Sequence, residues 1–180
     1  GELRSYVRFT PAMLNFALLK YRTAAHRERF QGKVALVCGG SRGLGADISA
    51  ALAFAGCHVY ASYINESNAL DEFEQSVRQN DLDLSFLKGD AGDPNWCKNV
   101  INQILDRNGK LDILVLNACS SPLPTGITSD AAVVFSEYVG KNLRLVQQPL
   151  TTFLPELEKT EGVIVGVSSS FVADPPRDFG

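Results

Sequence analysis

Short apolar runs alternate along the chain with longer segments in which apolar residues recur every three or four positions. The runs are rich in valine, isoleucine and leucine, as is typical of strands buried on both faces of a parallel sheet. The longer segments have the period of amphipathic helices. The pattern predicts strands at residues 34–38, 58–62, 84–88, 111–117 and 163–168. It predicts helices at residues 44–55, 67–79, 94–107 and 130–157.

Strands and helices that alternate in this way imply right-handed crossovers and a parallel sheet with helices on both faces. The expected fold class is therefore α/β, a doubly wound Rossmann-type domain over residues 32–180 with the strand order 3-2-1-4-5. Residues 1–31 would form a separate helical extension or linker. Pro149 lies inside the last helix and should bend or split it, because proline removes a backbone hydrogen bond.

The fifth strand would lie at an open edge of this sheet. Residues 163–167 are almost wholly apolar, and an uncovered apolar edge invites aggregation. The chain also begins with Gly1 instead of Met. These features predict that the sequence is a piece of a longer polypeptide, whose remaining part or a partner domain covers the edge.

The first strand runs into a glycine-rich loop with the spacing Gly39-x-x-x-Gly43-x-Gly45. Gly39 can make the tight turn, Gly43 lets a phosphate approach without a Cβ in the way, and Gly45 lets the helix pack close to the strand. The helix N-terminus would offer unpaired amides and a partial positive charge. An ordinary strand-to-helix turn also uses glycine, but the flanking pattern favours a dinucleotide-binding loop. Its expected contacts include Ser41, Arg42 and Leu44.

The loop resembles that of the short-chain dehydrogenase/reductase family, whose motif reads Thr-Gly-x-x-x-Gly-x-Gly. Cys38 stands where this family usually has Thr. Four later segments, in the family's order, extend the resemblance over residues 32–180. They contain Asp90 and Ala91, which would meet the adenine, Asn117 and Ala118, which would line the coenzyme site, and Asn142 and Ser169 of the catalytic set. Leu116 and Cys119 depart from the family's Asn-Asn-Ala-Gly sequence.

The resemblance implies an oxidoreductase that transfers hydride reversibly between nicotinamide and a carbonyl or alcohol carbon. Ser169 would hydrogen-bond the substrate oxygen, and Asn142 would hold a water that links the family's Lys to solvent. The family's Tyr-x-x-x-Lys pair would follow shortly after Gly180. The glycine loop is also similar to that of ketoacyl reductases, which favours a β-ketoacyl thioester or a similar ketone as the substrate.

NADP is the expected coenzyme rather than NAD. An NAD site normally has an acid at the end of the second strand for the ribose 2′-hydroxyl, whereas a 2′-phosphate needs cations and hydroxyl donors. This strand ends in Ser62 and Tyr63 without an acid, and Glu66 comes a little late. Arg42 lies where NADP-preferring members of the family carry a basic residue.

A dinucleotide-binding module without catalysis, acting as a sensor or scaffold, is the second hypothesis. The departures at Cys38, Leu116 and Cys119 support it. The residues that follow Gly180 would separate the two hypotheses, because only the enzyme needs the Tyr and the Lys. The resemblance also implies a homo-oligomer, since relatives are mostly dimers or tetramers.

The composition is typical of a globular domain, with 45% hydrophobic and 21% charged residues. A net charge of −3 argues against a nucleic-acid partner, since binding phosphates needs clustered Lys and Arg. Residues 1–33 differ from the rest, because they hold seven Lys or Arg against two Glu. Residues 10–30 predict an amphipathic helix that packs on its own or a neighbouring domain. The alternative is a helix that docks on a membrane surface or a partner.

The cysteines show no C-x-x-C spacing and only two histidines accompany them, so no metal site is expected. Each cysteine lies in or beside a predicted core element, which favours reduced core thiols in a cytoplasmic protein. They are Cys38, Cys57, Cys97 and Cys119. No apolar run is long enough to span a membrane, and no signal-peptide pattern is present.

Overall fold

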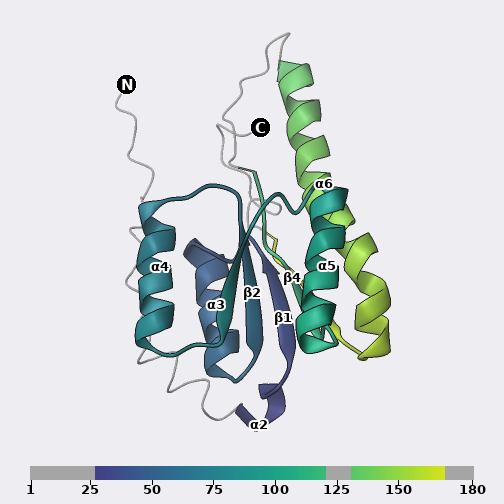
Figure 1. Ribbon diagram of the computed structural model, residues 1–180. Helices are drawn as coiled ribbons and strands as arrows, with labels where there is room; N and C mark the ends of the chain where they lie inside the picture. The colour runs from purple at the N-terminus through teal and green to yellow at the C-terminus, as the bar shows by residue number, and fades with distance from the viewer. Residues whose placement is uncertain (1–26, 121–130, 169–180) are drawn as a thin grey trace.

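The computed structural model describes residues 27–120 and 131–168. A five-stranded parallel sheet in the order β3-β2-β1-β4-β5 forms its centre (Figure 1). The strands are β1 Val34–Cys38, β2 His58–Tyr63, β3 Leu84–Lys88, β4 Ile113–Leu116 and β5 Val163–Gly166. The helices are α2 Arg27–Phe30, α3 Gly43–Phe54, α4 Asn68–Gln79, α5 Pro94–Asn108 and α6 Ala131–Lys159.

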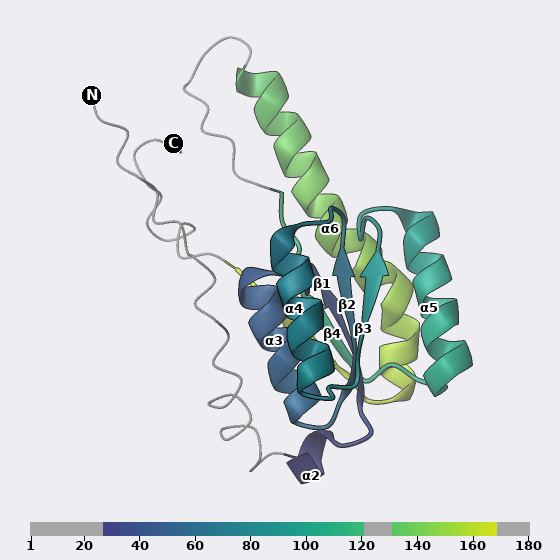
Figure 2. The same cartoon turned by 60° about the vertical axis from the view of Figure 1, so that its left-hand side comes forward.

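Helices α3 and α4 cover one face of the sheet, and α5 and α6 cover the other (Figure 2). The side chains of β1 alternate between these two layers. Leu36 packs in a cluster with residues of α5 and α6, whereas Ala35 and Val37 pack with residues of α3. These layers and the strand order confirm the α/β class and the doubly wound topology expected from the sequence.

Helix α6 is continuous over Ala131–Lys159 with Pro149 and Pro155 inside it, so the helix is not split. Each proline removes one backbone hydrogen bond from the helix. Packing compensates for this loss, because Pro149 and Phe153 are fully buried and Leu157 is nearly so. The helix expected at residues 10–30 lies outside the described residues except for its last turn, which is α2.

The outer edge of β5 has no partner strand among the described residues. Its apolar side chains are exposed, with Val163 at 55% and Val165 at 42% of their full accessibility. Helix α6 also leaves Phe135 and Leu143 exposed. No helix in the described part of the chain is long and apolar enough to cross a membrane.

Three of the four cysteines, Cys38, Cys57 and Cys97, are buried as expected. Burial raises the pKa of Cys57 and that of Cys97 to about 11, with nearby carboxylates adding to the effect. Both thiols are therefore protonated at neutral pH. The prediction for Cys119 was wrong, because this residue follows the end of β4 and is exposed in the loop.

A buried carboxylate joins the starts of β1 and β4 at the end of the sheet opposite the glycine loop. Asp112 is 3% exposed and accepts hydrogen bonds from Lys33 Nζ at 2.8 Å and from the Val34 amide at 2.9 Å. Lys110 Nζ lies 3.1 Å from its second oxygen. Burial by itself would raise the pKa of Asp112, but these hydrogen bonds outweigh it and hold the pKa below the ordinary value.

We expect Asp112→Asn to destabilise the intact protein by about 2–3 kcal/mol at neutral pH, because the amide loses charge-assisted hydrogen bonds. The lowered pKa means that the carboxylate stabilises the fold fully above its ordinary pKa of 3.8, and that this contribution is lost as the pH falls through the folded-state value. The free energy of unfolding, measured with urea from pH 7 to pH 3, should therefore fall less steeply with decreasing pH in the variant than in wild type. Asp106→Asn, at an exposed position of α5, is the control. An equal decrease in the free energy of unfolding with falling pH in wild type and Asp112→Asn would contradict this account.

Candidate coenzyme site

The candidate residues meet at the carboxyl edge of the sheet. The loop between β1 and α3 lies there, next to the ends of β2, β3 and β4. The strand order reverses between β1 and β4, and the crevice at such a reversal is where doubly wound sheets bind ligands. The sheet topology alone therefore brings segments from residues 39–45, 62–63, 90–91 and 117–118 to one edge.

The loop's three key glycines have different physical reasons to be glycine. Gly39 has a φ of +71°, and a Cβ there would lie 3.0 Å from the Cα of Ala118. A Cβ on Gly45 would overlap the carbonyl oxygen of Gly39 and the side-chain amide of Asn117. Gly43 has a φ of +51° and no atom within 4 Å of its Cβ position. The loop is thus crowded at Gly39 and Gly45 and open at Gly43.

Strands on both sides of β1 hold the loop in place. The Gly39 amide donates to Ser62 Oγ at 3.0 Å, and Asn117 Nδ2 donates to the Gly39 carbonyl at 2.9 Å. The Gly40 amide donates to the Ser62 carbonyl at 3.0 Å. Ser62 is 2% exposed, so its hydroxyl holds the loop through the Gly39 amide and is not open to solvent. Asn117 likewise positions the loop through its amide.

The N-terminus of α3 keeps its polar groups available. Arg42 occupies the N-cap position with extended backbone, and its side chain makes no capping hydrogen bond. No acidic residue lies in the first turn. Uncapped first-turn amides carry the positive end of the helix dipole and suit an anion. Together with the open space at Gly43, this arrangement fits the diphosphate of a dinucleotide.

The remaining loop residues differ in exposure. Arg42 and Leu44 are exposed, Tyr63 is partly exposed, and Ser41 is buried, with 6% of its surface accessible. The buried Ser49, which sequence reasoning missed, donates its hydroxyl to the Gly40 carbonyl at 3.0 Å. A serine in an alanine-rich helix segment was the only sequence signal for this contact.

The segment after β3 is held by its own polar contacts. Asp90 Oδ1 accepts from the Gly92 amide at 2.8 Å, which fixes the carboxylate at the sheet edge. Ala91 is buried in the core, so only its backbone could reach a ligand. Trp96, the single tryptophan, donates its Nε1 to the Lys88 carbonyl at 2.9 Å and leaves no room for a Cβ on Gly89.

Asn142 joins α6 to the chain that follows β4. Its Oδ1 accepts from the Ser120 amide at 2.9 Å, and its Nδ2 donates to the Tyr138 carbonyl at 2.9 Å. The side chain therefore positions the loop beyond Asn117 and Ala118. Ser169 lies outside the described residues, shortly after the end of β5 at Gly166.

An ion pair beside the end of β2 was not predicted from the sequence. Lys88 Nζ lies 2.6 Å from Glu66 Oε1, with both side chains exposed. The hydrogen bond from Lys88, and then its charge, lower the pKa of Glu66. The two residues are far apart in the sequence, so only the pairing of β2 with β3 brings them together.

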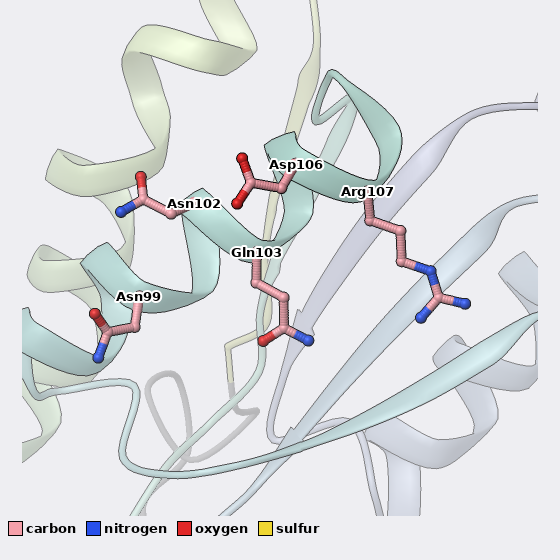
Figure 3. Close-up of a pocket in the computed structure, with 5 residues that line it drawn as sticks. All are labelled: Asn99, Asn102, Gln103, Asp106 and Arg107. Atoms are coloured by element: carbon pink, nitrogen blue, oxygen red, sulfur yellow. The ribbon is translucent and has the colours of Figure 1, made fainter.

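An open depression of about 500 Å³ lies elsewhere, along α5. Figure 3 shows its lining residues, all of which project from this one helix: Asn99, Asn102, Gln103, Asp106 and Arg107. The depression lies along the middle and C-terminal half of α5, and no residue of the glycine loop lines it. The sheet edge, and not this depression, is therefore the candidate coenzyme site.

Comparisons with known proteins agree with the geometry of the sheet edge. The family model described as short chain dehydrogenase matches residues 33–177. The chain is 37% identical over 90 residues to versicolorin reductase of Emericella nidulans, covering 50% of this chain and 34% of that protein. It is 31% identical over 141 residues to L-fucose dehydrogenase of Rattus norvegicus, covering 78% of this chain and 50% of that protein. The chain thus spans no more than half of either relative.

Solved structures share the fold. A double mutant of a Serratia marcescens short-chain dehydrogenase/reductase superposes with a TM-score of 0.71 at 28% identity, covering 82% of this chain and 59% of that one. A short-chain dehydrogenase/reductase of Caenorhabditis elegans, solved with cofactor, gives a TM-score of 0.70 at 26% identity, covering 82% and 56%. The family match extends over most of the sequence, from the start of β1 to beyond β5. The chain therefore belongs to the short-chain dehydrogenase family.

Proposed function

We propose that this chain is the coenzyme-binding part of an NADP(H)-dependent oxidoreductase that transfers hydride between nicotinamide and a carbonyl or alcohol substrate. The observation that carries the proposal is the uncapped N-terminus of α3 beside a glycine loop that is pinned through Gly39 to both neighbouring strands. Two relatives are, by their names, a reductase and a dehydrogenase, and one structural neighbour was solved with a cofactor. These names support oxidoreduction for this chain.

Each residue of the site has a task in this proposal. The first-turn amides of α3 bind the diphosphate, and the exposed Arg42 binds the adenosine 2′-phosphate. The Asp90 carboxylate accepts a hydrogen bond from the adenine amine. The nicotinamide ring, when bound, donates or accepts the hydride. Ser169 holds the substrate oxygen, and Asn142 keeps the chain after β4 in position through Ser120.

The substrate proposed for the first assays is a β-ketoacyl thioester or a similar ketone, because the glycine loop resembles that of ketoacyl reductases. A silent dinucleotide-binding module is the competing function. The exposed Cys119 at the end of the Asn-Ala segment favours it, because it replaces the glycine that the family's enzymes usually have there. Both functions require coenzyme binding, and only the first requires turnover.

We expect Gly45→Ala to raise the Kd for NADP by at least about tenfold, because the new Cβ displaces the Gly39 carbonyl and Asn117. Calorimetric titration of the intact protein measures this constant, and circular dichroism shows whether the variant is folded. Gly140→Ala is the matched control, since nothing lies closer to its Cβ position than an Arg144 nitrogen at 4.0 Å. A folded Gly45→Ala variant that binds NADP like wild type would place the diphosphate elsewhere.

We expect Arg42→Ala to weaken NADP binding by about tenfold and to leave NAD binding unchanged, because only NADP carries the 2′-phosphate. Arg78→Ala, which removes an exposed arginine from α4, is the control. Equal losses for the two coenzymes would assign Arg42 to the diphosphate or to the fold and not to the 2′-phosphate.

We expect Ser169→Ala to lower kcat by about 100-fold with little change in coenzyme binding, because the hydroxyl interacts with charge that develops during the reaction. NADPH oxidation by the intact protein with a short β-keto thioester measures the rate. Ser168→Ala is the control and tests the alignment of the serine run. A rate for Ser169→Ala equal to that of wild type would remove Ser169 from the mechanism. Tight NADPH binding without turnover of a panel of ketones and thioesters by wild type would favour the silent module.

A further inference from the structure

The exposed ion pair Lys88–Glu66 has no evident role in stability. Its nitrogen and oxygen lie 2.6 Å apart, but the side chains are 57% and 70% exposed. Ion pairs exposed to this degree contribute little to folding, because water screens them and two long side chains must be ordered. The pair instead connects the last residue of β3 to the turn between β2 and α4. This turn leads directly away from the position proposed for the adenosine ribose.

The sheet places Lys88 beside the end of β2. Lys88 pairs in register with Tyr63, and neighbouring strands are about 4.8 Å apart. Side chains alternate along β3, so Lys88 lies on the same face as Phe86, which contacts Phe73 of α4. Helix α3, whose N-cap position is Arg42, packs on that face as well. Arg42 follows β1 and Lys88 ends β3, so the two residues flank the end of β2, and Lys88 lies on the face that α3 covers.

The backbone of Lys88 is held more firmly than its side chain. Trp96 donates its indole N–H to the Lys88 carbonyl at 2.9 Å, and the next amide, of Gly89, donates to the Tyr63 carbonyl at 2.7 Å. The ammonium group is the exposed end of this anchored residue. Such an arrangement lets the charge change partner without any movement of the strand.

Glu66 and Lys88 have opposite effects on the two coenzymes. A free Glu66 carboxylate would repel a 2′-phosphate and could accept a hydrogen bond from the 2′-hydroxyl of NAD. Lys88 neutralises this carboxylate, and its ammonium could equally bind a phosphate. The balance between the two residues thus bears on the choice of coenzyme.

We propose that Lys88 is a second determinant of NADP specificity, which exchanges the Glu66 carboxylate for the adenosine 2′-phosphate when the coenzyme binds. The inference rests on the proposed function, because it needs the adenosine at the end of β2. It reconciles the proposed preference for NADP with the presence of Glu66 after β2, and it adds a residue from β3 to the cation expected at Arg42.

Calorimetric titration of NADP, NAD and adenosine 2′,5′-bisphosphate into the intact protein tests the exchange. Lys88→Met should raise the Kd for NADP and for the bisphosphate by about three- to tenfold and leave NAD within about twofold. Glu66→Gln should strengthen NADP binding and weaken NAD binding, because it removes the competing anion. Lys159→Met, which removes the exposed Lys159–Glu156 pair of α6, should change none of these constants.

Two results would overturn the exchange: Lys88→Met weakens NADP and NAD equally, or it changes neither. The Arg42→Ala variant separates such a failure from a failure of the proposed function. If Arg42→Ala loses NADP selectivity while Lys88→Met keeps it, only the role of Lys88 is wrong. If wild type binds none of the three ligands, the proposed coenzyme site itself is wrong.

Discussion

The close approach of α3 to the end of β1 is the constraint on which the site depends. The helix can begin so near the strand only because Gly45 has no Cβ to strike the Gly39 carbonyl and Asn117. The chain must then turn within residues 39–42, and Gly39 does so with a positive φ. The consequence is a helix N-terminus that opens at the carboxyl edge of the sheet, where the strand order reverses.

Several polar side chains of the site make hydrogen bonds to the protein's own backbone. Ser62 and Asn117 hold Gly39 from the two neighbouring strands, and Asn142 holds the Ser120 amide from α6. Each contact joins two elements that are distant in sequence. A loop fixed in this way loses little conformational entropy when it binds a ligand, which is how preorganisation improves affinity.

The charges at the two ends of the sheet serve different purposes. At the amino edge, the buried Asp112 carboxylate accepts hydrogen bonds from Lys33 and from a backbone amide and pairs with Lys110. These contacts stabilise the fold. At the carboxyl edge, Arg42, Lys88 and Glu66 are exposed. Exposed charges contribute little to stability but remain available to a charged ligand.

The sequence by itself determined the α/β class, the strand order and the glycine loop, because period, apolar content and glycine spacing are local properties that the fold preserves. It also placed Asp90 and Asn117 just after the ends of their strands, and Asn142 inside its helix, for the same reason. It left open whether Pro149 bends or splits its helix, which is continuous with Phe153 and Leu157 buried, and it misjudged Cys119, which is exposed in the loop. Only the tertiary structure decided that Ser62 supports Gly39 and that Lys88 meets Glu66, because hydrogen bonds and ion pairs between strands depend on register, which no local pattern encodes.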